Sequence, residues 1–336
     1  MTEPAPILSV AARIADEVLF PAAARTDASE LIPAGQLDLL AAEGFYGLAG
    51  PAEAGGLGLS LAQACQVVEL LASGCLATTF VWLQHHSAVR AAATAPEPSL
   101  RAAWLEPLCR GIRRAGIALG GAQPGPPRLR ARPASGGYLL DGTSPWVTGW
   151  GMIDTLYAVA RDGQDNLVAA LLDAGDGPTL SARPLRMVSV NASRTVELSF
   201  DSHFVPGERV TSVMPHAQWL AADAMGLRMN GSLALGLAAR CCQMIGPGPL
   251  DAELACCRGA LDAAGPAELP AARATAAALA MRTAAALVTV TGSRAVLAGE
   301  HPQRLAREAL FLLVFGSRPL IKQHLTALLT SPAVSG

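Results

Sequence analysis

The spacing of hydrophobic positions changes twice along the chain. From residue 7 to about 113, apolar residues recur every three or four positions, which is typical of helices that pack through one face. Ser60 and Gln63 form a capping box that begins a predicted helix over 60–74. The apolar face of that helix is Leu61, Cys65, Val68 and Leu71. The first third of the chain is therefore predicted to be helical.

Residues 116–210 follow a different pattern, in which short alternating segments are separated by turn dipeptides. Asp162-Gly163 separates two such segments, and Gly136-Gly137 and Asp141-Gly142 mark further turns. From Trp219 to about 330 the helical spacing returns in an alanine-rich form. These patterns predict an α+β protein with an all-helical domain over 1–114, an antiparallel β domain over 115–212 and a helical bundle over 213–336.

Composition supports closely packed helices and excludes some partners. Of the 336 residues, 51% are hydrophobic but only 4% are aromatic, so the apolar content is mostly Ala, Leu and Val. Charged residues make up 15% of the chain and the formal net charge is −2. A chain of this charge lacks the excess of basic residues that binding to nucleic acid or an anionic membrane requires. We therefore expect a small-molecule substrate and no nucleic acid partner.

The longest apolar segments are interrupted by charges. Arg13, Asp16 and Glu17 lie within the first apolar segment at helical spacing, unlike the core of a signal peptide, so a cytoplasmic protein is expected. Arg273 and Arg282 interrupt the alanine-rich stretch from residue 271 to 290, so no membrane span is expected. The small residues on several faces of this stretch suit packing in the bundle and against a second subunit.

The cysteines and histidines of the sequence are not spaced as metal ligands usually are. The seven cysteines form no C-x-x-C, so we interpret them as small apolar core residues. His85 and His86 are neighbours on one predicted helix, so their side chains diverge by roughly 100° and cannot share one metal. We expect a core or domain-boundary role for both histidines and no metal site.

The segment from Asp141 to Gly149 indicates a cofactor surface. A hairpin turn at Asp141-Gly142 would place Trp146 and Thr148 two residues apart on one face of a strand. A planar apolar ring beside a hydroxyl donor suits a planar cofactor, although a core tryptophan would show the same pattern. Thr148 is predicted to donate a hydrogen bond to that cofactor.

Several segments in the same order resemble the acyl-CoA dehydrogenase family. They are residues 39–47, 51–60, 141–148 and 193–201. The resemblance implies a helical N-terminal domain, a β-barrel-like middle domain, a C-terminal four-helix bundle, FAD, an acyl thioester substrate and a dimer or tetramer. It places FAD against Ala122, Gln123, Trp146, Val147 and Thr148, and it implies that Arg228 lines the acyl cleft.

The same resemblance leaves the catalytic base unidentified. Family members use a glutamate at one of two positions, and these are matched here by Gly316 and Leu227. Neither side chain can accept a proton. If the chain nevertheless oxidises acyl thioesters, Asp223, before Arg228 on the same predicted helix, is the first carboxylate to test.

Three functions remain open at this point. The first is a flavoprotein oxidoreductase of acyl-CoA dehydrogenase type, acting on an acyl group carried by CoA or by a carrier protein. The second is a subunit without a base that pairs with a complete relative in a hetero-oligomer. The third is a monooxygenase that uses reduced flavin and oxygen, which needs no α-proton base. Fold alone does not separate them.

Overall fold

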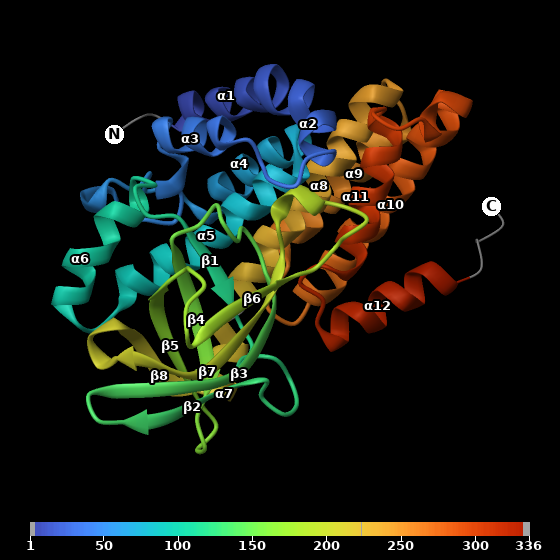
Figure 1. Ribbon diagram of the computed structural model, residues 1–336. Coiled ribbons are helices and arrows are strands. Elements are labelled where there is room, and N and C mark those ends of the chain that lie inside the picture. The colour runs from blue at the N-terminus through green and yellow to red at the C-terminus, as the bar shows by residue number, and fades with distance from the viewer. Residues whose placement is uncertain (1–3, 223, 332–336) are drawn as a thin grey trace.

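Helices from both ends of the chain pack together, and a β domain from the middle of the chain projects from them (Figure 1). This computed structural model describes residues 4–222 and 224–331. The order of helices, strands and helices confirms the predicted α+β architecture. The first strand starts at Ala115, as predicted, whereas the last strand continues to Pro215, beyond the predicted boundary at residue 212.

The N-terminal third is helical throughout. The π-helical turn η1 (Ile14–Leu19) joins the first two helices. The helices of this N-terminal third are α1 (Pro4–Arg13), α2 (Phe20–Asp27), α3 (Ala34–Ala42), α4 (Leu61–Gly74), α5 (Leu76–Thr94) and α6 (Pro98–Cys109). The predicted capping box at the start of α4 is confirmed. Ser60 Oγ accepts from the Gln63 amide at 3.3 Å, and Gln63 Oε1 accepts from the Ser60 amide at 3.0 Å.

The β domain is one sheet of eight strands in the order β6, β7, β3, β2, β4, β5, β8, with β1 beside β4. The strands are β1 (Ala115–Ala118), β2 (Leu129–Ala134), β3 (Gly137–Val147), β4 (Thr155–Arg161), β5 (Asn166–Asp173), β6 (Leu180–Pro184), β7 (Val196–Pro206) and β8 (Val210–Pro215). Most pairs are antiparallel, as predicted, but β1 pairs in parallel with β4, from Ala115 opposite Thr155. The chain leaves the helical region at β1 and returns to the same end of the sheet before β4, so both strands point the same way.

The predicted turn at Asp141-Gly142 is wrong. The hairpin between β2 and β3 closes at Gly136, with φ +77°, and β3 then continues through Asp141 and Gly142. A register shift relative to β7 lies between Leu140 and Gly142. A Cβ at Gly142, where φ is +118°, would overlap the carbonyl oxygen of Arg128. Close approach of the backbone, and not a chain reversal, explains this glycine.

The C-terminal helices form a bundle around α10. The helices are α7 (His216–Ala222), α8 (Ala224–Ile245), α9 (Pro249–Ala263), α10 (Leu269–Thr291), α11 (His301–Val314) and α12 (Pro319–Thr330). Helix α10 contacts α8, α9, α11 and α12. One helical stretch in the described chain, Leu269–Val296, is long and apolar enough to cross a membrane by length and composition. Its α10 portion buries residues on several faces inside the bundle.

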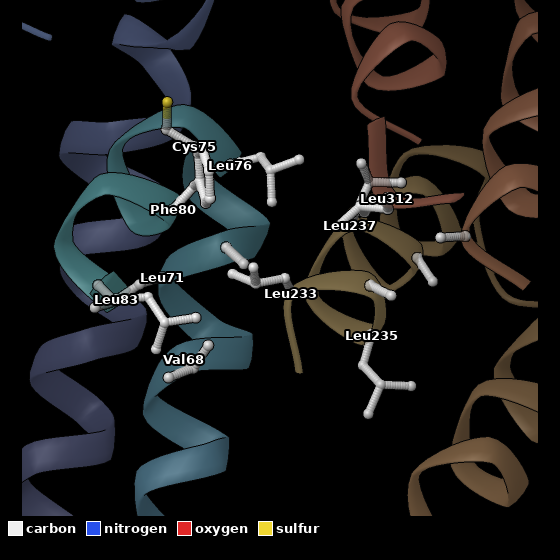
Figure 2. Packing of buried hydrophobic residues seen from close by; sticks show 14 of the residues in the cluster. Val68, Leu71, Cys75, Leu76, Phe80, Leu83, Leu233, Leu235, Leu237 and Leu312 are labelled. Carbon is white, nitrogen blue, oxygen red and sulfur yellow. The ribbon is translucent and has the colours of Figure 1, made fainter. Parts of the chain in front are cut away.

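One hydrophobic core joins the N-terminal and C-terminal helices. Figure 2 shows Val68, Leu76 and Phe80 of α4 and α5 opposite Leu233 and Leu237 of α8, and all five residues belong to the same buried cluster. Gly236 permits this close packing, because a Cβ there would overlap the carbonyl oxygen of Glu69 on α4. The two helical regions are therefore one packed unit.

Candidate functional site

The loop between β1 and β2 lies against the middle of β3. A Cβ at Gly120 would overlap Thr143 O and lie 3.1 Å from Ser144 Cα. The amide of Thr143 donates to Arg128 O at 2.8 Å, so both ends of the loop are fixed to the strand. The structure therefore brings the predicted cofactor residues Ala122 and Gln123 close to the strand that leads to Trp146.

A buried arginine and a buried histidine hold this loop in place through hydrogen bonds to its carbonyl groups. Arg161 Nε donates to Gly121 O at 2.8 Å, and Arg161 Nη2 donates to Gln123 O at 2.6 Å. His216 Nε2 lies 3.0 Å from Ala122 O, which fits a donated hydrogen bond. The carbonyl groups of Ala122 and Gln123 are thus turned toward the protein. Sequence analysis missed Arg161, although a charged residue in the apolar strand of residues 156–161 could have indicated it.

Trp146 and Thr148 do not share a face, so that prediction is wrong. Trp146 has φ +63°, and β3 shifts register relative to β7 between Ser144 and Val147. The alternation of side chains is broken there: Trp146 is 62% exposed, whereas Val147 and Thr148 are 0% and 2% exposed. Val147 belongs to the core of the β domain. Trp146 alone of these three presents its side chain to solvent.

The hydroxyl of Thr148 belongs to a short chain of buried hydroxyls. Thr148 Oγ1 lies 3.2 Å from Thr195 Oγ1, which lies 2.9 Å from Ser193 Oγ. Nearby on β3, Ser144 Oγ is buried and has no hydrogen-bond partner among the described residues. The site therefore combines an exposed indole with buried hydroxyls. The exposed indole of Trp146 fits a flat group lying against it, and the hydrogen bond from Thr148 to a cofactor stays a prediction.

The two positions matched to the family's base lie close together. Gly316, between α11 and α12, has φ +60°, and a Cβ there would lie 3.0 Å from Asn230 Nδ2 of α8. Leu227, less than one turn before Asn230, packs on Ala274 and Ala277 of α10 and on Ile321 and Leu325 of α12. The space around both positions therefore offers apolar groups and an amide. Asp223 lies outside the described residues.

Arg228 lies on another face of α8 and lines a pocket of about 390 Å³. The pocket is bounded by the N-terminal end of α4, including Leu61 and Cys65, and by Asp262 of α9. Arg228 Nε donates to Asp262 Oδ1 at 3.1 Å, and Arg228 Nη1 donates to Ser232 Oγ at 3.0 Å. Burial raises the pKa of the Cys65 thiol. Arg228 thus lines a cavity, with its charge balanced by Asp262, and its place in an acyl cleft stays a prediction.

The predicted core roles of the cysteines and histidines are largely confirmed. Six of the seven cysteines are buried and Cys256 is exposed, and all are free thiols. His85 and His86 are 1% and 2% exposed. The part of the chain that the structure describes has no group of three or more His, Cys, Asp or Glu side chains able to hold a metal ion.

Comparison with known proteins finds similarity to acyl-CoA dehydrogenases. The family model for the N-terminal domain of acyl-CoA dehydrogenases matches residues 3–112. Benzylmalonyl-CoA dehydrogenase of Aromatoleum aromaticum is 27% identical over 201 residues, which cover 58% of this chain and 53% of that protein. The mitochondrial isovaleryl-CoA dehydrogenase of Oryza sativa is 26% identical over 210 residues, covering 59% of this chain and 51% of the relative. The chain is therefore similar in sequence to acyl-CoA dehydrogenases over a little more than half of its length.

Solved structures agree with the acyl-CoA dehydrogenase fold over nearly the whole chain. A glutaryl-CoA dehydrogenase in complex with glutaryl-CoA superposes with a TM-score of 0.85 at 17% identity, covering 97% of this chain and 95% of that one. Butyryl-CoA dehydrogenase of Megasphaera elsdenii gives 0.84 at 17% identity, covering 98% and 99%. In sequence, by contrast, the matched part spans about half the length of the curated acyl-CoA dehydrogenases.

Proposed function

We propose that this chain is a member of the acyl-CoA dehydrogenase family, a cytoplasmic flavoprotein oxidoreductase that binds FAD and acts on an acyl thioester. The observation that supports it most directly is Trp146. A tryptophan with φ +63° and 62% exposure contributes little to folding and costs about 1 kcal/mol of backbone strain. Strained, exposed residues of this kind concentrate at functional sites. PigA, which superposes with a TM-score of 0.84, is a structure with FAD and proline, so the fold holds this cofactor elsewhere.

Each residue of the proposed site has a separate task. The indole of Trp146 covers one face of the flavin ring, and the loop of Ala122 and Gln123 borders it. Arg161 and His216 keep this loop in place through its carbonyl groups. Bound FAD would supply a hydride acceptor for the acyl chain. The proton that must leave with the hydride has no acceptor at Gly316 or Leu227.

The first experiment measures flavin binding by the purified chain. We expect a yellow protein, or a protein that quenches FAD fluorescence on titration. Trp146→Ala should weaken FAD binding about tenfold, because one stacked aromatic face is lost. Phe204→Ala is the matched control, since Phe204 is another exposed aromatic residue of the sheet at 47% exposure. A protein that binds no FAD, or equal binding by both variants, would contradict the proposal.

The missing proton acceptor supports a second candidate, a subunit that pairs with a complete relative. Leu227 packs among apolar side chains, and Gly316 offers only its backbone. Anaerobic mixing with an acyl-CoA separates the candidates. Bleaching of the flavin by the chain alone supports the oxidoreductase and requires a base elsewhere. Bleaching only after co-expression with a related chain supports the partner subunit, and oxygen uptake that depends on a flavin reductase supports the monooxygenase.

A further inference from the structure

Arg273 differs from every other buried arginine of the described chain. Five arginines are less than a tenth exposed, and four of them have a carboxylate partner. The pairs are Arg161 with Asp165, Arg228 with Asp262, Arg240 with Asp16, and Arg304 with Glu308. Arg273 is 1% exposed, has no ion pair among the described residues, and its Nη1 has no hydrogen-bond partner.

The side chain of Arg273 reaches the carbonyl groups at the end of α11, next to Gly316. It leaves α10 and passes α8, where a Cβ at Gly231 would lie 3.7 Å from Arg273 Cδ. Its Nη2 then donates to Leu312 O at 3.3 Å and, at 3.5 Å, to Phe315 O, the residue before Gly316. These carbonyl groups end α11, and their partial negative charge favours a cation there. They do not supply a full countercharge, and they leave Nη1 unused.

Space for a small group exists beside Gly316. Within 4 Å of a Cβ at this position lie only two atoms of the Asn230 side-chain amide. Gly316 and Asn230 are both partly exposed, so solvent reaches this point of the bundle. Burial lowers the pKa of Arg273 to about 10, which leaves the guanidinium charged at neutral pH. A buried cation with a free donor and an amide beside an opening together favour an anion.

We propose that Arg273 and Asn230 form a site for the carboxylate group of an acyl ligand next to Gly316. A carboxylate supplies the countercharge that the other buried arginines already have, and it accepts from both the guanidinium and the amide. The proposed site lies next to the position where the resemblance implies a proton acceptor. Placing the carboxylate on an acyl substrate depends on the proposed function; the anion site itself depends only on these residues.

The test is thermal unfolding of the full chain with small ligands, without flavin or thioester. Sodium propionate is compared with propionamide, its neutral isostere, and with sodium chloride at equal ionic strength. We expect a saturable rise of the Tm with propionate only. Arg273→Met should weaken the response by a factor of at least about ten, Arg273→Lys should keep part of it, and Arg282→Met should respond like the wild type. Arg282 is the matched control, because it lies exposed on the same helix.

A second pair of variants keeps the proposal testable if Arg273→Met does not fold. Asp and Asn both tolerate the left-handed backbone at residue 316, and only Asp carries a charge. Gly316→Asp should unfold at a higher temperature than Gly316→Asn and should lose the propionate response. The difference between them should shrink in Arg273→Lys, whose point charge cannot pair bidentately. Equal Tm values for the two variants, or an equal response to propionate and propionamide, would overturn the site. Neither result bears on FAD binding, so the proposed function is tested by a separate experiment.

Discussion

At the scale of single residues, two adjacent buried histidines of α5 differ in their hydrogen bonding. His85 Nε2 lies 3.0 Å from Leu108 O, and His85 Nδ1 accepts from the Ala115 amide at 3.0 Å. His85 therefore joins α5 to the end of α6 and the start of β1. His86 has no hydrogen-bond partner for either ring nitrogen and packs edge-on against Trp82, with ring centroids 4.6 Å apart. His85 thus holds the chain where it enters the β domain, and His86 only fills space in the core.

Replacement by phenylalanine should separate these roles. His85→Phe leaves the Leu108 carbonyl and the Ala115 amide without partners and should lower the free energy of unfolding by about 2 to 5 kcal/mol. His86→Phe removes two unpaired polar atoms at similar volume and should be neutral or stabilising. Urea denaturation at pH 7.5 measures both. Comparable destabilisation by the two variants would show that His86 has a polar role.

The same two residues predict how stability depends on pH. Burial lowers the pKa of His85 to about 3 and that of His86 well below its usual value. The unfolded chain therefore takes up protons near pH 6.5, whereas the folded chain does not. Stability is fully present above pH 6.5 and falls as the pH drops from 6.5 toward 3, by about 1.4 kcal/mol per pH unit for each histidine. The His86→Phe variant should lose stability less steeply over this range than the wild type.

At the scale of elements, β3 shows what the sequence could and could not predict. The sequence correctly predicted a strand leading to Val147, and the predicted turn at Gly136-Gly137 lies where β2 and β3 meet. Asp141-Gly142 has the composition of a hairpin turn, but the turn lies at Gly136 and the strand continues. The register shifts at Gly142 and Trp146 depend on pairing with β7, which is distant in sequence. Local spacing therefore could not reveal that Trp146 and Thr148 point apart.

Two glycines of this hairpin provide a matched pair. Gly136 has φ +77° and nothing within 4 Å of an added Cβ, so Gly136→Ala should cost only the backbone strain, about 1 kcal/mol. Gly142→Ala adds an overlap with Arg128 O and should cost about 3 kcal/mol or more. Chemical denaturation compares the variants. Equal costs would mean that β2 can move away from β3 without loss.

At the scale of the whole molecule, exposed apolar side chains gather on the C-terminal helices. They are Val290, Val296, Leu297, Leu310, Val314, Leu320, Leu328 and Leu329. The alanine-rich helix α10, expected to pack inside the bundle and against a second subunit, buries 11 of its 23 residues. We propose that the oligomer forms through these exposed residues at the end of α10 and on α11 and α12, because solitary proteins rarely expose so many apolar side chains together.

Sedimentation at micromolar concentration tests this proposal. The wild type should sediment as a dimer or larger species, and Val296→Asp with Leu297→Asp should shift it toward the monomer. Leu61→Asp is the control, since Leu61 is exposed at 42% on α4, outside this group. A monomeric wild type, or an equal shift by the control, would contradict an interface at this surface.

The shared helical core has a consequence for synthesis on the ribosome. Helices α4 and α5 are complete before the β domain is made, but their partner α8 begins only at Ala224. Residues 95–223 intervene, and at about 5 to 20 residues per second these 129 residues take about 6 to 26 s to translate. During that interval the apolar faces of α4 and α5 that pack against α8 lack their partner. Nascent chains paused within the β domain should therefore be bound by chaperones, and release should coincide with the emergence of α8.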